Sequence, residues 1–241
     1  MLAALSERST DPEIMDSFHG DITALKRVLD DINSVNRILG GNHITTQSVA
    51  RLVQAHNKEQ YTIIDVGCAD GSMLRELARY ARKRGLKITF IGIDLSAKAL
   101  QLAENASVDF PEISYLQLDV LQLQASELQC DILITTLMTH HFTDANLTVL
   151  LAQFVRLAKI GVVINDLHRS RLAFYLFKLF SLLFITTDTA RIDGLISIRK
   201  GFKKQDLIRF SRQLPQMQHS IQWKWAFRYV WIMEPNRPKN L

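Results

Sequence analysis

Acidic residues and glycines with a distinctive spacing occur in the first third of the chain. The segment Ile63–Gly71 reads Ile-Ile-Asp-Val-Gly-Cys-Ala-Asp-Gly, in which an apolar strand runs through Asp65 into a tight turn. A helical run follows from Ser72. A strand, a glycine turn and a helix bring backbone N–H groups and a helix N-terminus close to a ligand. This pattern therefore indicates a site for a nucleotide or phosphate ligand.

A second acid, Asp94, ends the next apolar segment, Lys87–Asp94. A carboxylate at this position can accept hydrogen bonds from both hydroxyls of a ribose. A dinucleotide is disfavoured, because Ala69 occupies the middle small position and the Gly-x-Gly-x-x-Gly spacing is missing. Asp65 would also repel a pyrophosphate, whereas it suits the cationic end of an amino acid.

These motifs resemble those of class I S-adenosylmethionine-dependent methyltransferases, which have an acid and a small-residue turn followed by a ribose-binding acid. The resemblance extends over residues 60–170, through Leu118-Asp119-Val120 and the segment Asp131–Met138. It implies S-adenosylmethionine as cofactor and S-adenosylhomocysteine as product. The cofactor-binding residues that it implies are Asp65, Gly67, Ala69 and Gly71 for the methionine end, Asp94 for the ribose, Asp119 and Val120 for the adenine, and also Leu95 and Thr136.

Histidines follow two of the expected strands. His140 and His141 come after the fourth strand, and His168 comes after the fifth, two residues beyond Asp166. Open α/β sheets bind ligands at this carboxyl edge. Methyl transfer from a sulfonium needs mainly in-line placement of the acceptor, but a phenol or enol must also lose a proton, which histidine can accept.

We expect one of these histidines to be the catalytic base. His168 is the first choice, because a strand-end residue is held more firmly than one in a loop. The alternative is that the histidines only hydrogen-bond a loop or pack on the cofactor. No metal ion is expected.

A more particular similarity involves Asn165–Ser170, Arg191–Gly194 and Ser197–Phe202. These segments are similar to a bacterial subgroup of small-molecule methyltransferases from polyketide and quinone-like pathways. The similarity implies an apolar, aromatic or enolic acceptor, with O-methylation favoured. Taken by themselves, Asp193-Gly194 is typical of a turn and Ser197 of a helix cap.

The periodicity of the core predicts an α/β fold. Strands at 61–66, 87–94, 113–120, 130–138 and 161–167 alternate with helices at 72–84, 96–108 and 144–158. Segments 220–227 and 228–233 predict an antiparallel pair, with which the methyltransferase family closes its sheet. We therefore expect a Rossmann-like seven-stranded sheet, mostly parallel, with an antiparallel C-terminal hairpin.

Two helices are predicted before this core. Apolar residues recur at three- and four-residue intervals from Ile22 to Leu39 and stop at Gly40-Gly41. A second helix is expected to start with Thr45 or Thr46 as its cap. We predict an N-terminal helical cap at 1–58 and a core at 59–241 in one compact domain. The cap either covers cofactor and substrate or only packs on the sheet.

An apolar helix is expected to be inserted after the fifth strand, at 169–187. Leu172–Ile185 is shorter than the roughly 20 apolar residues of a membrane span, and Lys178 interrupts it. The helix could belong to the core, roof an apolar substrate pocket, or dip into a membrane surface. Its phenylalanines cannot all face one way, so only some of them should line such a pocket.

Length and cysteine content favour one domain in a reducing compartment. The 241 residues suffice for a sizeable core, and Met1–Thr10 lacks the pattern of a signal peptide. Cys68 and Cys130 should fall at opposite edges of a parallel sheet, which makes a disulfide implausible. A cytoplasmic location is therefore expected.

The basic excess is modest, with 29 Lys and Arg against 24 Asp and Glu, and part of it clusters between residues 199 and 212. This cluster is either a solvated helix face or a patch for an acyl carrier protein or an anionic membrane surface. Nucleic acid is disfavoured, because aromatics do not alternate with the cations. Thr135-Thr136-Leu137-Met138 also stands where amine-methylating enzymes have Asn-Pro-Pro-aromatic.

The predicted function is methyl transfer from S-adenosylmethionine to a small apolar acceptor. One alternative is the same chemistry on RNA or on a carrier-bound chain. Another is a non-catalytic protein that binds S-adenosylmethionine or a nucleotide. The sequence makes no prediction of the oligomeric state.

Overall fold

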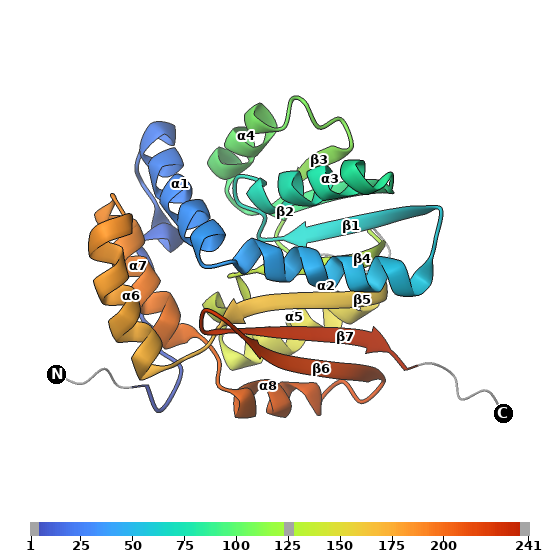
Figure 1. Cartoon of the computed structure of the whole chain (residues 1–241). Coiled ribbons are helices and arrows are strands. Elements are labelled where there is room, and N and C mark those ends of the chain that lie inside the picture. The colour runs from blue at the N-terminus through green and yellow to red at the C-terminus, as the bar shows by residue number, and fades with distance from the viewer. Residues whose placement is uncertain (1–4, 123–127, 237–241) are drawn as a thin grey trace.

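A seven-stranded sheet forms the centre of the computed structural model, which describes residues 5–122 and 128–236 (Figure 1). The strand order is β3-β2-β1-β4-β5-β7-β6; β7 pairs antiparallel with β5 and β6, and the other neighbouring strands are parallel. This topology confirms the predicted Rossmann-like fold with its antiparallel C-terminal hairpin. The strands are β1 (Gln60–Val66), β2 (Lys87–Asp94), β3 (Ile113–Gln117), β4 (Cys130–Thr136), β5 (Ala158–Leu167), β6 (Met217–Lys224) and β7 (Arg228–Pro235).

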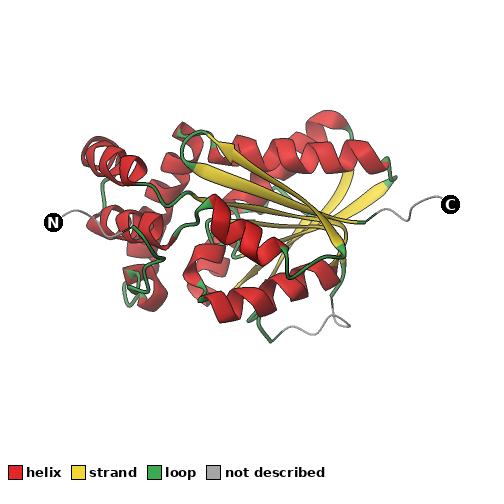
Figure 2. Cartoon of the chain, turned by 90° about the horizontal axis from the view of Figure 1, so that it is seen from below, coloured by secondary structure: helices red, strands yellow, loops and turns green. Residues whose placement is uncertain are grey.

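Helices cover both faces of the sheet (Figure 2). The central strands β4 and β5 are therefore buried along almost their whole length, as expected for parallel strands between two helical layers. One face packs against α5 and α8 through Phe154 and Phe210, and the other packs against α2 and α3 through Leu52 and Leu74. The helices of these layers are α2 (Gly41–His56), α3 (Ser72–Arg84), α4 (Ala97–Ala106), α5 (Asp144–Leu157) and α8 (Lys204–Ser211).

The remaining helices gather beyond the carboxyl ends of the parallel strands (Figure 1). They come from the N-terminal segment, from the loop after β4 and from the insertion after β5, and this insertion contributes two helices instead of the one predicted. In the described part of the chain, no helix combines the length and apolarity needed to cross a membrane. These helices are η1 (Ile14–Ser17), α1 (Ile22–Ile38), η2 (Thr139–His141), α6 (Arg171–Phe184) and α7 (Asp188–Lys200).

The junction of α1 and α2 differs from the prediction. Gly40 adopts a positive φ of 72° and ends α1, as expected, but α2 starts at once with Gly41. Thr45 and Thr46 are therefore inside α2 and cap nothing; the buried Thr45 hydroxyl accepts a hydrogen bond from Asn165 Nδ2 at 3.0 Å. Residues 1–4 of the predicted cap lie outside the described residues, and the division at residue 58 remains a prediction.

The predicted turn at Asp193-Gly194 and the predicted cap at Ser197 are also wrong, since all three residues lie inside α7. Gly194 allows the Phe177 ring of α6 to pack closely against α7. A Cβ atom at this position would lie 2.3 Å from the Phe177 ring of α6. A glycine thus occurs inside α7 because α6 and α7 approach each other closely at this position. Both cysteines are buried and free.

Candidate active site

A largely apolar cavity of about 590 Å³ lies at the carboxyl ends of the central strands, beneath α1 and α6. Open α/β sheets bind ligands at this edge. The glycine turn after β1 forms one part of the wall, and the end of β4 contributes Thr136. α1, α6 and the β6–β7 hairpin complete the enclosure with Leu29, Ile32, Val35, Leu176, Phe177, Phe180, Trp225 and Phe227.

The glycine turn is fixed by the neighbouring strand β2. The N–H groups of Gly67 and Cys68 donate to the Ile93 carbonyl at 2.8 and 3.1 Å, and the Ala69 N–H donates to Asp94 Oδ2 at 2.9 Å. Gly67 has a φ of 74° and Ala69 one of 47°, a region that favours glycine and is strained for alanine. This backbone brings Gly67 and Ala69 to the cavity wall, and the Met138 side chain occupies the space that a Cβ atom at Gly67 would need.

Asp65 is buried in this wall, with 2% of its surface exposed. Its Oδ1 has no hydrogen-bond partner among the described residues. Burial, and secondarily the charge of Asp94, raise the pKa of the Asp65 carboxyl well above its usual range. A buried carboxylate without a partner is costly, and a bound cation would remove that cost. Asp65 therefore fits the ammonium group of a methionine moiety.

The residues expected around the ribose and adenine lie beside this cavity rather than in its wall. Asp94 Oδ1 accepts from the Ser96 N–H at 2.9 Å, and Asp119 Oδ1 accepts from the Leu121 N–H at 2.9 Å. Leu95 is 65% exposed, and Val120 is buried in the core. The structure thus groups these residues at the ends of β2 and β3, next to the turn.

Gly71 also lies outside the cavity wall, although it belongs to the turn. A Cβ atom at Gly71 would lie 2.1 Å from the Tyr115 hydroxyl. The close packing against β3, together with a φ of 71°, explains the glycine without any ligand contact.

His140 is held by Asp166 at the cavity. The Asp166 Oδ1 atom accepts a hydrogen bond from His140 Nδ1 at 2.6 Å, and its Oδ2 accepts from the Thr139 hydroxyl at 2.5 Å. These three side chains are buried. The other ring nitrogen, Nε2, has no hydrogen-bond partner among the described residues and lies 3.6 Å from Glu13 Oε1. Asp166 thus orients His140 from one side, while its Nε2 faces Glu13 without a hydrogen bond.

The charge state of His140 follows from its two acidic neighbours. Burial alone lowers the pKa of His140, but Asp166 and Glu13 outweigh burial and raise this pKa to about 9. The pKa of Asp166 is held well below its usual range by His140, despite burial. His140 is therefore protonated at neutral pH in the protein without ligands.

His141 also borders the cavity, and its Nδ1 lies 3.0 Å from Asp16 Oδ1. His168, the first choice from the sequence, is not among the described residues that line the cavity. Its Nδ1 accepts from Trp223 Nε1 at 3.2 Å, and its ring packs edge-on against Tyr229. The pairing of β5 with β7 holds His168 under the C-terminal hairpin.

Glu13 and Arg228 are two charged residues of the cavity wall that no sequence motif identifies. Glu13 comes from the N-terminal segment, and its Oε1 lies 3.3 Å from the Lys200 ammonium. Glu13, His140 and His141 offer potential metal-ligand atoms within 4.8 Å of one another. Because Lys200 already supplies a cation to Glu13, an ion-pair cluster accounts for this arrangement.

Comparison with known proteins agrees with the geometry. Residues 63–161 match a family model described as a methyltransferase domain. The plantazolicin methyltransferase BpumL in complex with SAH is similar in fold, with a TM-score of 0.68 and 14% identity, covering 92% of this chain and 93% of that chain. Magnesium protoporphyrin IX methyltransferase (ChlM) from Synechocystis PCC 6803 with bound SAH gives a TM-score of 0.60 and 16% identity, covering 92% and 98%.

An O-methyltransferase family protein from Burkholderia thailandensis gives a TM-score of 0.66 and 15% identity, covering 96% of this chain and 66% of that chain. A search of curated proteins finds no match. The domain match confirms the methyltransferase resemblance predicted from the acids and the glycine turn, and the solved structures show the shared fold.

Proposed function

We infer that this chain is a class I S-adenosylmethionine-dependent methyltransferase that methylates an oxygen atom of a small apolar acceptor. The methyltransferase domain at 63–161 supports the reaction class. The observation that carries the choice of acceptor is the cavity, which joins the glycine turn to an apolar wall from α1 and α6.

S-adenosylmethionine supplies a methyl group made reactive by its sulfonium. Asp65 would accept from the ammonium of its methionine end, which would lie against the cavity wall formed by Gly67 and Ala69. Asp94 would accept from the ribose hydroxyls. The other residues proposed to surround the cofactor are Gly71, Leu95, Asp119, Val120 and Thr136.

The apolar wall would exclude water and orient the acceptor. Side chains from α1 and α6, such as Ile32, Phe177 and Phe180, face the cavity from two directions. Pockets of this kind bury most of a small ligand, and a few polar groups then fix its orientation. His140, with its free Nε2, is the polar group proposed to meet the acceptor oxygen.

We propose His140, in place of His168, as the base that takes the acceptor's proton, with Asp166 as the residue that positions it. A base works only in its deprotonated form. The raised pKa of His140, about 9, therefore places this activity on the alkaline side of neutrality.

An entry route for apolar acceptors is suggested by α6. Leu179 and Leu183 line the cavity, yet they are 62% and 75% exposed. The same helix wall is thus accessible from both the cavity and the solvent. We propose that the acceptor enters the cavity along the exposed leucines of α6. Delivery from a membrane surface and delivery by a carrier protein both remain predictions.

The basic cluster between residues 199 and 212 gives little support for the binding of a carrier protein. Arg199 pairs with Asp11 at 2.8 Å, and Lys200 is buried against Glu13. Arg209 pairs with Asp144 at 2.5 Å. Much of the local positive charge is thus neutralised within the chain, which favours structural roles for these cations.

The proposal is tested with the variant Phe177→Asp, assayed with naphthols and enolic diketones as acceptors. A carboxylate in the apolar wall should abolish methyl transfer while S-adenosylhomocysteine still binds. Leu182→Asp is the matched control, since Leu182 is on the same helix but outside the cavity wall. Equal turnover by wild type and Phe177→Asp would show that acceptors do not use this cavity.

A further inference from the structure

Arg228, the first residue of β7, brings a buried positive charge to the cavity. Only 2% of its surface is exposed, and it is among the cavity-lining residues. Its Nη2 donates to Asn36 Oδ1 at 2.5 Å. Its Nε and Nη1 have no hydrogen-bond partner among the described residues, and none of the described ion pairs includes Arg228. Two donors of this guanidinium are thus unsatisfied.

Asp166, whose negative charge acts on Arg228, does not satisfy these donors. Burial lowers the pKa of Arg228 to about 10, and Asp166 only partly offsets that effect. Both oxygens of Asp166 already accept hydrogen bonds, from His140 and Leu167 at Oδ1 and from Thr139 and His140 at Oδ2. Buried charges and donors are normally paired in proteins, so the two free donors of Arg228 call for a ligand.

The backbone makes room for this guanidinium. A Cβ atom at Gly41 would lie 2.8 Å from Arg228 Cζ, so a side chain there would displace the group. Gly41 is itself fixed, because its carbonyl accepts from Asn165 Nδ2 at 2.9 Å. The position of Arg228 is thus determined by the junction of α1 and α2.

We propose that the guanidinium of Arg228 binds a carboxylate of the acceptor, so that the substrates are apolar acids that also carry the hydroxyl to be methylated. The planar fork of a guanidinium matches the two oxygens of a carboxylate. This inference rests on the proposed function, and it names the substrate class of the same cavity.

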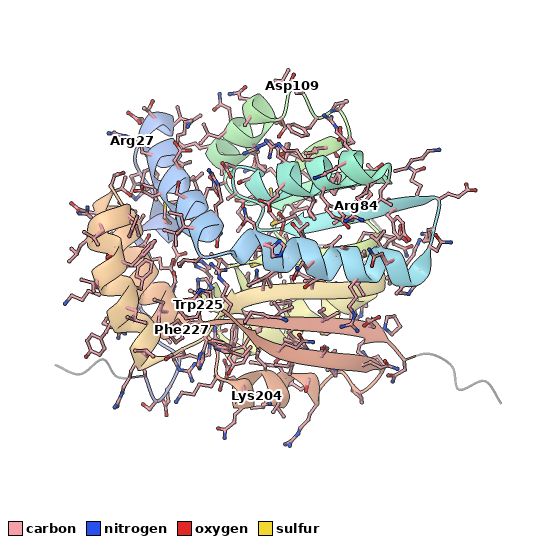
Figure 3. The ribbon with its side chains drawn as sticks, in the orientation of Figure 1. Arg27, Arg84, Asp109, Lys204, Trp225 and Phe227 are labelled. Carbon is pink, nitrogen blue, oxygen red and sulfur yellow. The ribbon has the colours of Figure 1, made fainter. Side chains whose placement is uncertain are left out.

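The methionine end of the cofactor also carries a carboxylate, but the position of Arg228 favours the acceptor. The glycine turn follows β1, whereas Arg228 lies on β7, three strands away. Three strand spacings amount to about 14 Å. Trp225 and Phe227, which come just before Arg228 in the hairpin between β6 and β7, also line the cavity and lie on the side of α6 and α7 (Figure 3).

The test compares the binding of 2-naphthoic acid and 2-naphthamide to the protein saturated with S-adenosylhomocysteine, by titration calorimetry. The wild type should bind the acid at least about tenfold more tightly than the amide, as expected for a charge-assisted pair. Arg228→Gln should remove this preference and leave the affinity for S-adenosylhomocysteine unchanged. Arg228→Lys keeps the positive charge but lacks the planar guanidinium, so it should retain only part of the preference for the acid.

Arg84→Gln is the matched control, because Arg84 is exposed at the end of α3, away from the cavity (Figure 3). This variant should bind 2-naphthoic acid and 2-naphthamide with the same affinities as the wild type. If thermal melting shows that Arg228→Gln does not fold, Gly41→Ala provides the second variant: it keeps the arginine, displaces its guanidinium and should lower the preference for the acid.

Two results would overturn the assignment of Arg228. One is equal binding of acid and amide by the wild type. The other is a loss of S-adenosylhomocysteine affinity in Arg228→Gln with the acid preference intact, which would assign Arg228 to the cofactor's carboxylate. A wild type that binds neither S-adenosylmethionine nor its product would contradict the proposed function instead.

Discussion

Individual side chains of the cavity are held in ionisation states that differ from those in water. Asp65 is pushed toward its protonated form by burial, and His140 toward its protonated form by Asp166 and Glu13. Perturbed ionisation of this kind clusters at functional sites. Proton uptake and release should therefore accompany both binding and turnover.

Binding of S-adenosylhomocysteine should release a proton from Asp65. The pKa of this carboxyl is raised in the protein without ligand, and a bound ammonium would stabilise the carboxylate and lower it. Affinity should therefore increase with pH until Asp65 is ionised without the ligand. Calorimetry in two buffers of different ionisation enthalpy measures the released proton. Equal heats in the two buffers would contradict this role, and Asp65→Asn should abolish any difference.

The rate of methyl transfer to a phenol should rise with pH toward about 9. His140 must lose its proton before it can accept one, and its pKa is raised to about 9. His140→Gln should lower the rate by roughly 10²–10⁴-fold, the usual contribution of a general base. His168→Gln serves as the control and should keep near-normal rates. A pH profile that is identical in wild type and His140→Gln would show that placement alone drives the reaction.

At the scale of elements, much of the fold was predictable because apolar strands end in acids and glycines at regular intervals. Helix starts and glycines within helices were less predictable where contacts with residues distant in the sequence determine them. Gly41 starts α2 before the threonines that resemble caps and lies against Arg228, and the glycine within α7 lies against Phe177. Local residue preferences could not reveal either contact, since both depend on tertiary packing.

Replacing Gly194 by Ala should separate stability from acceptor binding. Alanine favours a helix over glycine by about 1 kcal/mol. The new methyl group would displace the far end of the Phe177 ring, which can move into the cavity. We therefore expect an unchanged or higher melting temperature together with a higher KM for the acceptor. A lower melting temperature with an unchanged KM would mean that α6 and α7 cannot adjust in this way.

At the scale of the whole molecule, the site combines segments from both ends of the chain. Glu13 precedes the first long helix, Lys200 ends α7 and Arg228 starts β7. The glycine turn and Asp94 could be recognised from the sequence, because their motif is local. Glu13 and Arg228 could not, since single charged residues acquire a role only when folding brings them together. His168 was chosen for its position at the end of a strand, but its hairpin contacts place it elsewhere.

The central claim is that the glycine turn binds S-adenosylmethionine, and titration calorimetry with S-adenosylhomocysteine and NAD tests it most directly. We predict micromolar-range affinity for S-adenosylhomocysteine and none for NAD. Asp94→Ala should weaken this affinity by about 1–3 kcal/mol, because ribose hydroxyls lose their acceptor. Asp109→Ala, at an exposed acid beyond α4 (Figure 3), should have no effect. Binding of NAD without binding of S-adenosylhomocysteine would contradict the account.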